Sequence, residues 1–468
     1  MPHTLYTTAD IRRIEAAAGT VAPPLMERAG LAAADLAVRI LGAGGKDVLV
    51  LAGPGNNGGD ARIAARILQE RFFRVHVATV DQPPPDGVRW GLVIDGLFGI
   101  GLARDVDGAY AKLVALANAQ PCPRLALDIP SGIDSDTGRV LGSAVRATHT
   151  VTFIALKPGL LTLDGPDHCG EVTVAGLGLD AKALVEPAGW VAGPDLLRGL
   201  LKPRPRNFHK GMAGSVAVIG GAPGMTGAAV LASRAALRLG AGRVYVGLLD
   251  ADSPSSDPFT PELMLRSPDD ALGLDLDAIV IGPGIGSSGH AETLVGEVLA
   301  IDVPCVLDAD ALNLIAENAD LRAACARRGA ETVVTPHPAE AARLLGCATA
   351  EVQRDRLKAA RDLSKALNAH VVLKGSGSVL VARDGHWFIN TSGNPGMSSG
   401  GMGDVLAGIL GALLAQGFTG EASMIAGVHL HGVAADVLAA SGTGPVGLTA
   451  GETIDAARRV WNGWLAGG

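Results

Sequence analysis

Short apolar runs rich in β-branched residues alternate with helical patterns along most of this chain, and this alternation constrains the fold more than any other feature. Runs of this kind read as parallel strands buried on both faces. They occupy residues 48–51, 75–78, 92–94, 125–127, 215–219, 244–246, 278–281, 306–307, 333–334 and 371–373. Strands that alternate with helices predict doubly wound α/β sheets. Two helices, 10–18 and 25–41, are expected before the first strand, separated by Pro23-Pro24.

The alternation lapses near residues 181–206, where Lys202-Pro203-Arg204-Pro205-Arg206 forms a stiff basic stretch typical of a linker. A chain of 468 residues is too long for one ordinary domain. We therefore expect two doubly wound α/β domains, residues 1–203 and 204–468. Their motifs differ, which indicates a fusion of unlike units instead of an internal repeat.

Composition limits the classes of function. Hydrophobic residues make up 48% of the chain, yet no apolar stretch reaches the roughly 18 residues that a membrane span needs. The first residues lack the basic-then-apolar order of a signal peptide, so a cytoplasmic protein is expected. A net charge of −8 disfavours nucleic-acid binding, and the five scattered cysteines form no C-x-x-C pair for a disulfide framework or a zinc site.

The glycine-rich run from Asn394 to Asp404 leads directly into the apolar segment 405–414. Glycines bring bare amide groups close to a ligand, and the N-terminus of a buried helix favours an anion such as phosphate. A carboxylate repels phosphate, so Asp404 makes more sense as a base for an incoming hydroxyl. The alternative is that Asp404 is only a helix N-cap.

Three polar loops follow predicted strands in the first domain: residues 53–60, 95–102 and 128–138. Ligands of open α/β sheets bind at the carboxyl ends of strands, so these loops should meet. Asn57, Asp95 and Ser131 would offer only oxygen ligands, which suits a hard cation. The alternative is that each aspartate only caps a turn. The first loop is not the G-x-G-x-x-G fingerprint, which disfavours a standard dinucleotide site.

Residues 8–200 resemble the YjeF N-terminal family, the NAD(P)HX epimerases, through the motifs 56–60 and 128–132. The resemblance implies a Rossmann-like three-layer sandwich and a potassium ion held by Asn57, Asp95 and Ser131. It implies substrate contacts from Asn56, Asn57, Gly58, Gly59, Asp60, Gly99, Ile100, Gly101, Leu102, Ala103, Arg104, Asp105 and Asp128. Ala61 stands where family members commonly have glycine, a departure that affects backbone approach more than chemistry.

The reaction of that family interconverts the R and S hydrates at nicotinamide C6. A carbon that carries both nitrogen and hydroxyl needs little more than reversible hydroxyl loss assisted by a general acid. Asp128 is the candidate for this acid, and Lys157 is a weaker candidate that could be structural instead.

Further motifs of the second domain fall mostly just after predicted strands, at 209–211, 220–228, 282–286, 335–338 and 374–378. Together with the Gly400–Asp404 loop they predict a glycine-lined phosphate cleft, and none of them is a Walker A motif. Each has a structural alternative: His337 could hydrogen-bond loop backbone, and Lys374 could be a solvated charge at a strand end. Asp308 and Asp310 could help hold hydrated magnesium, although we expect one of them to cap the following helix.

Residues 207–460 resemble the YjeF C-terminal family, the ADP- or ATP-dependent NAD(P)HX dehydratases of ribokinase-like fold, above all through the 394–404 run. By position, Ala228, Gly286, His337 and Asp404 would face the hydrated nicotinamide, with Gly284 as the alternative to Gly286. Lys374, Gly375, Ser376, Gly377, Ser378 and Gly403 would surround the adenine nucleotide.

Together the resemblances imply bifunctional repair of the hydrates NADHX and NADPHX. Asp404 would deprotonate the C6 hydroxyl of the S form, ADP with Mg²⁺ would donate its terminal phosphoryl group, and AMP and phosphate would be released. Bacterial fused members generally resemble ADP users, and a homo-oligomer is expected. The alternative functions are a ribokinase-like small-alcohol kinase for the second domain and a noncatalytic binding module for the first.

Overall fold

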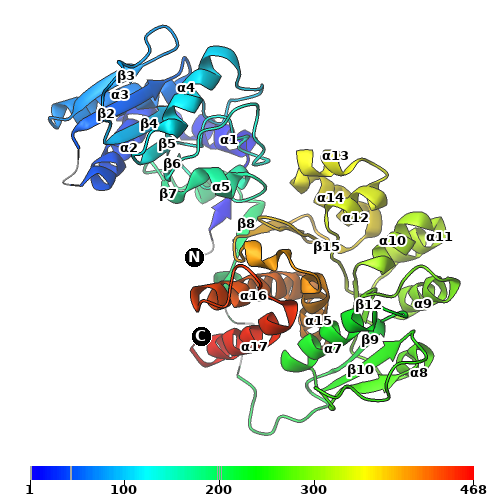
Figure 1. Cartoon of the computed structure of the whole chain (residues 1–468). Coiled ribbons are helices and arrows are strands. Elements are labelled where there is room, and N and C mark those ends of the chain that lie inside the picture. The colour runs from blue at the N-terminus through cyan, green and yellow to red at the C-terminus, as the bar shows by residue number, and fades with distance from the viewer. Residues whose placement is uncertain (1–2, 43–44, 198, 200, 202, 468) are drawn as a thin grey trace. The chain divides into compact units, whose positions relative to one another are not determined.

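The computed structural model describes residues 3–42, 45–197, 199, 201 and 203–467. These fall into two compact units, one from His3 to Trp190 and the other from Val191 onward. In each unit helices lie against the faces of a sheet (Figure 1). The domain boundary at 203–204 stays a prediction, and Lys202 of the expected linker lies outside the described residues.

The N-terminal unit has a sheet in the order β3-β2-β4-β5-β6-β7, with every neighbouring pair parallel. Its elements in chain order are β1 (Thr4–Leu5), α1 (Thr8–Ala18), α2 (Leu25–Leu41), β2 (Asp47–Ala52), α3 (Asn56–Glu70), β3 (Arg74–Ala78), β4 (Leu92–Gly96), α4 (Gly108–Ala119), β5 (Arg124–Leu127), β6 (His149–Phe153), η1 (Pro158–Leu160), α5 (Gly165–Cys169), β7 (Glu171–Ala175) and α6 (Ala181–Leu184). The strand β8 (Gly189–Ala192) spans the boundary between the two units.

The predicted strands and helices of this half are confirmed, but β1, β6, β7 and β8 were not predicted. β6 carries His149 and two threonines, and β7 alternates polar with apolar residues at the sheet edge, so neither forms a continuous apolar run. After β2 the chain adds β3 on one side of β2 and then β4 on the other. This reversal makes the carboxyl ends of β2 and β4 the topological switch point, where open α/β sheets bind ligands.

The second unit contains, after β8, η2 (Pro194–Leu197), β9 (Ser215–Gly220), α7 (Thr226–Arg238), β10 (Arg243–Leu248), β11 (Met264–Arg266), α8 (Pro268–Leu272), β12 (Ala278–Ile281), α9 (Gly289–Ala300), β13 (Cys305–Leu307), α10 (Asp310–Glu317), α11 (Ala319–Ala326), β14 (Thr332–Val334), α12 (Pro338–Leu345), α13 (Thr349–Arg354), α14 (Arg356–Leu367), β15 (His370–Leu373), β16 (Val379–Val381), β17 (Trp387–Asn390), η3 (Pro395–Ser398), α15 (Met402–Ala415), α16 (Gly420–Ala440) and α17 (Ala450–Gly467).

The sheet of this unit runs β17-β16-β15-β14-β13-β12-β9-β10-β11, and the six predicted strands are confirmed as β9, β10, β12, β13, β14 and β15. The chain builds β10 and β11 on one side of β9 and then places β12 on the other, which puts a second switch point between β9 and β12. β16 and β17 continue the sheet as antiparallel strands.

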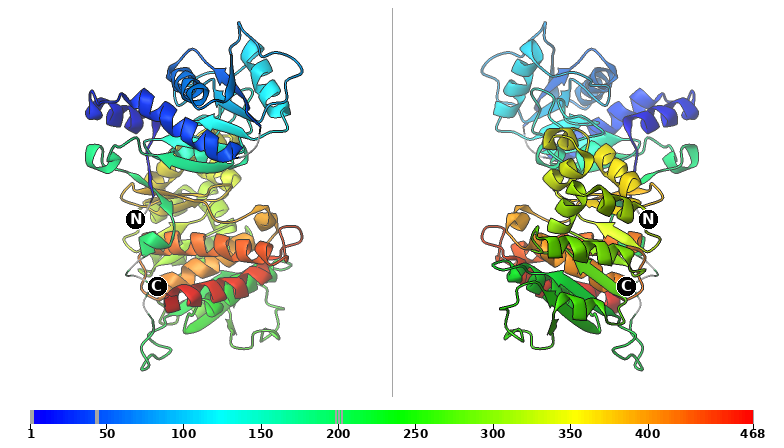
Figure 2. Two further views of the ribbon diagram at one scale, coloured as in Figure 1. Left: turned by 90° about the vertical axis from the view of Figure 1, so that its left-hand side faces the viewer. Right: turned by 90° about the vertical axis from the view of Figure 1, so that its right-hand side faces the viewer.

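The helices α15, α16 and α17 contact one another in this unit, and Figure 2 shows them side by side in orange and red. α15 is buried along nearly its whole length. By length and composition α16 could cross a membrane, but 72% of its apolar window is buried inside the structure, as in the core helix of a folded domain.

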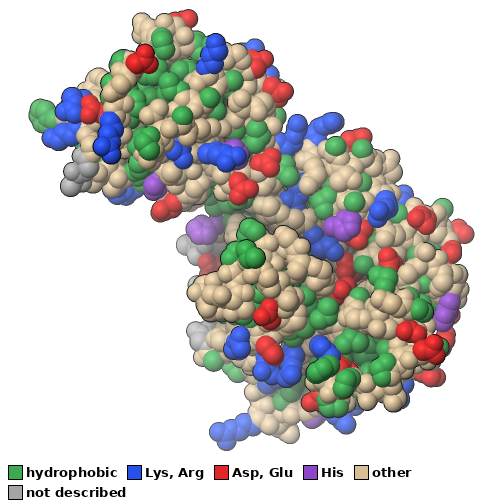
Figure 3. Space-filling model, viewed as in Figure 1, with side chains coloured by type: hydrophobic (Ala, Val, Ile, Leu, Met, Phe, Trp, Pro, Cys, Tyr) green, Lys and Arg blue, Asp and Glu red, His purple; other side chains and the backbone are tan. Residues whose placement is uncertain are grey.

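Charged side chains of both signs are interspersed on the face of the molecule shown in Figure 3. Among the described residues on that face, Lys and Arg do not gather into one extended basic surface.

Candidate functional sites

A cavity of about 710 Å³ opens at the carboxyl ends of β2, β4 and β5. The predicted substrate contacts that line it are Asn56, Asn57, Asp60, Gly99, Ile100, Gly101, Leu102, Ala103, Arg104 and Asp128. Gly58, Gly59 and Asp105 are not among the lining residues. Gly58 instead lies directly against the backbone of Gly53. A Cβ at position 58 would be only 1.9 Å from the Gly53 carbonyl oxygen. The volume suits a small-molecule site.

The three predicted potassium ligands lie together beside this cavity. The Ser131 hydroxyl donates to Asp95 Oδ1 at 2.6 Å, and the Ser131 amide donates to Asp95 Oδ2 at 2.8 Å. Asn57 Nδ2 donates to the carbonyls of Phe98 and Leu127 at 2.8 and 3.1 Å, but its Oδ1 is buried without a hydrogen-bond partner. Burial raises the pKa of Asp95 to about 6 despite its hydrogen bonds. An orphaned oxygen next to a buried carboxyl is an environment that fits a hard cation.

Asp128 sits directly after β5 in a left-handed conformation, with φ of 66°. Its carboxylate forms a salt bridge with the ammonium of Lys157, a side chain with no exposed surface. Lys157 also donates to Thr152 Oγ1 and the Phe153 carbonyl at 2.8 and 2.7 Å. Lys157 therefore fixes the Asp128 carboxylate in the wall of the cavity, where both side chains are lining residues, and the salt bridge favours the anion of Asp128. The general-acid assignments of Asp128 and Lys157 stay predictions.

Ala61, the departure from the family pattern, is fully buried. Its Cβ packs against Gly96, where a Cβ would lie 2.4 Å away from it. The glycine at position 96 therefore leaves room for the alanine, and the helix α3 still approaches β4 closely.

In the second unit the loops after β9 and β12 are locked together at the switch point. The amides of Gly221 and Ala222 donate to the carbonyls of Pro283 and Gly284 at 3.0 and 2.7 Å. Ala228 lies in the first turn of α7, and its Cβ would be 3.2 Å from a Cβ built on Gly284. The Gly286 amide does not take part in these contacts between the two loops, and it donates to Asp310 Oδ2 at 2.9 Å.

Asp308 and Lys374 form the charged centre of this site. Lys374 Nζ lies 2.9 Å from Asp308 Oδ1, and Thr335 Oγ1 donates to the same oxygen at 2.7 Å. Burial alone would lower the pKa of Lys374, but Asp308 and Glu340 raise it. A Cβ built on Gly403 would be 3.3 Å from Lys374 Nζ, so this pair lies against the first turn of α15. The alternative of a solvated lysine at a strand end is wrong.

The expectation that Asp308 or Asp310 caps the following helix is also wrong. The N-cap of α10 is Ala309, with no side-chain capping hydrogen bond, because both carboxylates are committed to other loops.

Asp404 is the third residue of α15, whose N-cap is Gly401 with φ of 89° and no side-chain capping bond. The alternative of an N-capping Asp404 is therefore wrong. Its pKa is raised to about 6, first by burial and then by the Asp308 carboxylate, while Lys374 opposes the rise. A carboxyl with this pKa is ionised at neutral pH yet accepts a proton more readily than an ordinary aspartate does, as a general base requires.

His337 caps helix α12 in a reciprocal arrangement with Glu340. Its Nδ1 accepts from the amides of Ala339 and Glu340 at 3.1 and 3.3 Å, while the His337 amide donates to Glu340 Oε2 at 2.7 Å. Burial, then Lys374 and Arg343, lower the pKa of His337. The imidazole is therefore neutral, with its proton on Nε2. His337 hydrogen-bonds the loop backbone, and 48% of its side chain is still exposed.

Arg356 at the start of α14 is a residue that the sequence did not single out. Its guanidinium is buried and donates to the carbonyls of Leu373, Lys374 and Ser376. It thus holds the loop 374–378 at the end of β15, where a nucleotide is expected. An isolated arginine in a helical pattern carries no local signal of such a role.

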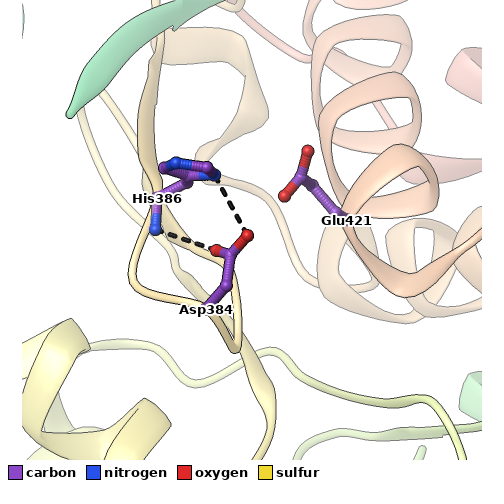
Figure 4. Close-up of side chains that lie close together, drawn as sticks. All are labelled: Asp384, His386 and Glu421. Atoms are coloured by element: carbon purple, nitrogen blue, oxygen red, sulfur yellow. Dashed lines mark hydrogen bonds and ion pairs between the residues drawn. The ribbon is translucent and has the colours of Figure 1, made fainter. Parts of the chain in front are cut away.

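Asp384, His386 and Glu421 form a separate group whose ligand atoms lie within 4.8 Å of one another (Figure 4). Asp384 and His386 come from the turn between β16 and β17, and Glu421 comes from the first turn of α16. β16 runs from the end near loop 374–378 to this turn, so the group lies at the opposite end of that strand from the expected nucleotide site. Asp384 and His386 are exposed.

Comparison with known proteins covers both units. A family model described as NAD(P)H-hydrate dehydratase matches residues 216–456. A second model, described as YjeF-related protein N-terminus, matches residues 23–90 and 85–159.

The bifunctional NAD(P)H-hydrate repair enzyme Nnr of Escherichia coli K12 is 37% identical, across 99% of this chain and 95% of that protein. The enzyme of the same name from Coxiella burnetii is 38% identical, across 98% and 99%. The ADP/ATP-dependent NAD(P)H-hydrate dehydratase of Bacillus subtilis, co-crystallised with ATP and Mg²⁺, superposes with a TM-score of 0.52 at 28% identity, covering 58% of this chain and 98% of that one. With both units matched and curated relatives aligned over almost its full length, this chain belongs to the family of bifunctional NAD(P)H-hydrate repair enzymes.

Proposed function

We propose that the two units of this repair enzyme act in sequence on hydrated NADH and NADPH, with a functional boundary at 203–204. The N-terminal unit interconverts the R and S hydrates at nicotinamide C6, and the C-terminal unit converts the S hydrate to the reduced nucleotide. The observation that carries this proposal is that each unit has its own constellation of polar side chains at its own topological switch point.

The oxygen ligands beside the first cavity support a potassium-dependent epimerase. Asn57, Asp95 and Ser131 would hold the ion, because the orphaned Oδ1 of Asn57 needs a partner and the buried carboxyl of Asp95 needs a compensating charge. When bound, potassium would supply that charge and steady the loop after β4. Asp128 lines the cavity as one half of a salt bridge and would stabilise positive charge that develops on the nicotinamide ring.

In the second unit Asp404 is the proposed base for dehydration. It takes the proton of the C6 hydroxyl, and the oxygen attacks the terminal phosphoryl group of ADP, which releases AMP. Phosphate then leaves C6 with the bonding electron pair, and the neighbouring ring carbon C5 gives a proton to solvent, which restores the double bond. Asp404 also returns its proton to solvent. Phosphorylation makes this possible because phosphate is a far better leaving group than hydroxide.

The residues around Asp404 suit the nucleotide. Lys374 and the free amides in the first turn of α15 would stabilise negative charge during transfer, and loop 374–378 with Gly403 would contact the adenine nucleotide. Ala228, Gly286 and His337 would face the hydrated nicotinamide. Mg²⁺ would enter with the phosphates of ADP, its usual mode of binding in such sites. We further propose a cytoplasmic homo-oligomer.

The test is recovery of reduced-nicotinamide absorbance from a mixture of R- and S-NADHX, with ADP, with ATP or without nucleotide, in buffer containing K⁺ and Mg²⁺. Complete, ADP-dependent recovery from both hydrates supports both proposed activities. Recovery that stops at the S fraction would contradict the epimerase, and accumulation of a stable phosphorylated product would return the small-alcohol kinase to consideration.

A further inference from the structure

Three carboxyl groups, Glu15, Asp60 and Asp128, line the cavity of the N-terminal unit, and the last two are in opposite chemical settings. Asp128 is paired with the buried ammonium of Lys157. Asp60, in the second turn of α3, is 9% exposed and lines the same cavity. Burial and the negative charges of Asp128 and Glu15 act on its carboxyl group, and none of the described residues forms a hydrogen bond or ion pair with it. A carboxyl group without a compensating partner is stable in such a place only when it keeps its proton.

Five charged side chains besides Asp60 line this cavity. Arg12 and Glu15 come from α1, Arg104 from the loop after β4, Asp128 from the end of β5, and Lys157 from the position directly before η1. Burial, followed by Asp128 and then Glu15, raises the pKa of Asp60 to about 8. Asp60 is therefore neutral at pH 7, while the neighbouring Asp128 is an anion in its salt bridge. Two adjacent carboxyl groups driven into different protonation states commonly divide the roles of acid and anion between them.

We infer that Asp60 is the general acid of epimerisation and that Asp128 is the anion that stabilises the cationic ring, an inference that rests on the proposed epimerase function. The Asp60 carboxyl gives its proton to the C6 hydroxyl, and the C6–O bond breaks with its electron pair on oxygen, which leaves as water. The lone pair of the ring nitrogen stabilises the resulting C6 cation. Water then adds to C6 from either face, and the Asp60 carboxylate takes back one proton, so that the enzyme and all atoms are restored.

This assignment predicts a specific pH dependence. The R-to-S rate should follow the protonated fraction of Asp60 and fall as the pH rises above about 8. Glu15→Gln removes a negative charge that holds the proton on Asp60, so the fall should move to lower pH. Asp60→Asn should lower the rate by about a hundred- to ten-thousand-fold below about pH 8 and remove the alkaline fall, so that the deficit against wild type shrinks as the pH rises above about 8.

The experiment uses full-length protein and separated R- and S-NADHX, with interconversion followed by chromatography without nucleotide. ADP-dependent dehydration of S-NADHX by the same samples shows that the other unit is intact, and thermal unfolding of each full-length variant shows whether the N-terminal unit is folded. Infrared difference spectra of wild type against Asp60→Asn at pH 7 supply a readout independent of activity, since a neutral carboxylic acid has a C=O band that a carboxylate lacks.

The outcomes separate this inference from the epimerase proposal. If wild type does not interconvert the hydrates, the epimerase itself is refuted. Three results with an active wild type would show that Asp60 is not the acid while leaving the epimerase proposal intact. They are an Asp60→Asn rate within about tenfold of wild type, an alkaline fall that Glu15→Gln does not move, and an infrared spectrum of Asp60→Asn that keeps every carboxylic-acid band of wild type.

Discussion

The ionisation of Asp404 should set the pH dependence of dehydration. Its pKa is raised to about 6, by burial first and by Asp308 second. A base acts only when ionised, and with that pKa about 90% of Asp404 is ionised at pH 7 but about 9% at pH 5. The value of kcat/KM for S-NADHX should therefore fall about tenfold between pH 7 and pH 5 and change little above pH 7.

The variant Asp308→Asn tests whether the acid limb of the pH profile belongs to Asp404. It removes the carboxylate that raises the pKa of Asp404, and it leaves Lys374, which lowers that pKa, without its partner. Both changes act in the same direction, so the acid limb of the profile should move to lower pH. A phosphate of the nucleotide also titrates near pH 6, but a limb that belongs to the nucleotide would not move with this substitution.

The assay is NADH absorbance from purified S-NADHX at saturating ADP and Mg²⁺, for wild type, Asp308→Asn and Asp404→Asn. Asp404→Asn should lose about a hundred- to ten-thousand-fold in kcat/KM, while R-to-S conversion by the same sample stays normal. Turnover of Asp404→Asn within about tenfold of wild type, or an acid limb that Asp308→Asn leaves in place, would refute the role of Asp404 as base.

Three other substitutions test the remaining structural arguments. Asp95→Asn should abolish potassium-dependent epimerisation. If wild type has a higher thermal midpoint in KCl than in choline chloride, Asp95→Asn should lose that difference. An equal difference in both proteins would place the ion elsewhere. Arg356→Met should raise the KM for ADP about tenfold or more, because loop 374–378 loses charged hydrogen bonds at three carbonyls, and an unchanged KM would contradict this positioning role. Gly408→Ala places a Cβ 2.0 Å from the Ala232 carbonyl oxygen, where α15 crosses α7, and should cost about 1–3 kcal/mol in urea unfolding; Gly463→Ala, with no atom near its Cβ, is the matched control.

Local patterns in the sequence were sufficient to predict most of the fold. The apolar runs became the central strands of two doubly wound sheets, because a strand buried on both faces must be apolar throughout. Several strands were missed. β6 contains two buried threonines and β7 alternates polar with apolar residues, so neither shows a continuous apolar run. β16 and β17 are short, fully buried and largely apolar strands that were not recognised. The loops that carry the glycine motifs lie together at each switch point, because loops at the carboxyl ends of neighbouring parallel strands converge.

Only the tertiary structure determines which charged side chains form ion pairs. Lys157 pairs with Asp128 across 29 residues, and Lys374 pairs with Asp308 across 66. No local pattern predicts pairs so far apart in the sequence, and the same is true of the bonds from Arg356 to loop 374–378. The sequence determined that aspartates stand at positions 60, 128 and 404, but whether each holds a proton depends on burial and on neighbours brought from distant strands, since those surroundings set the free energy of its charged form.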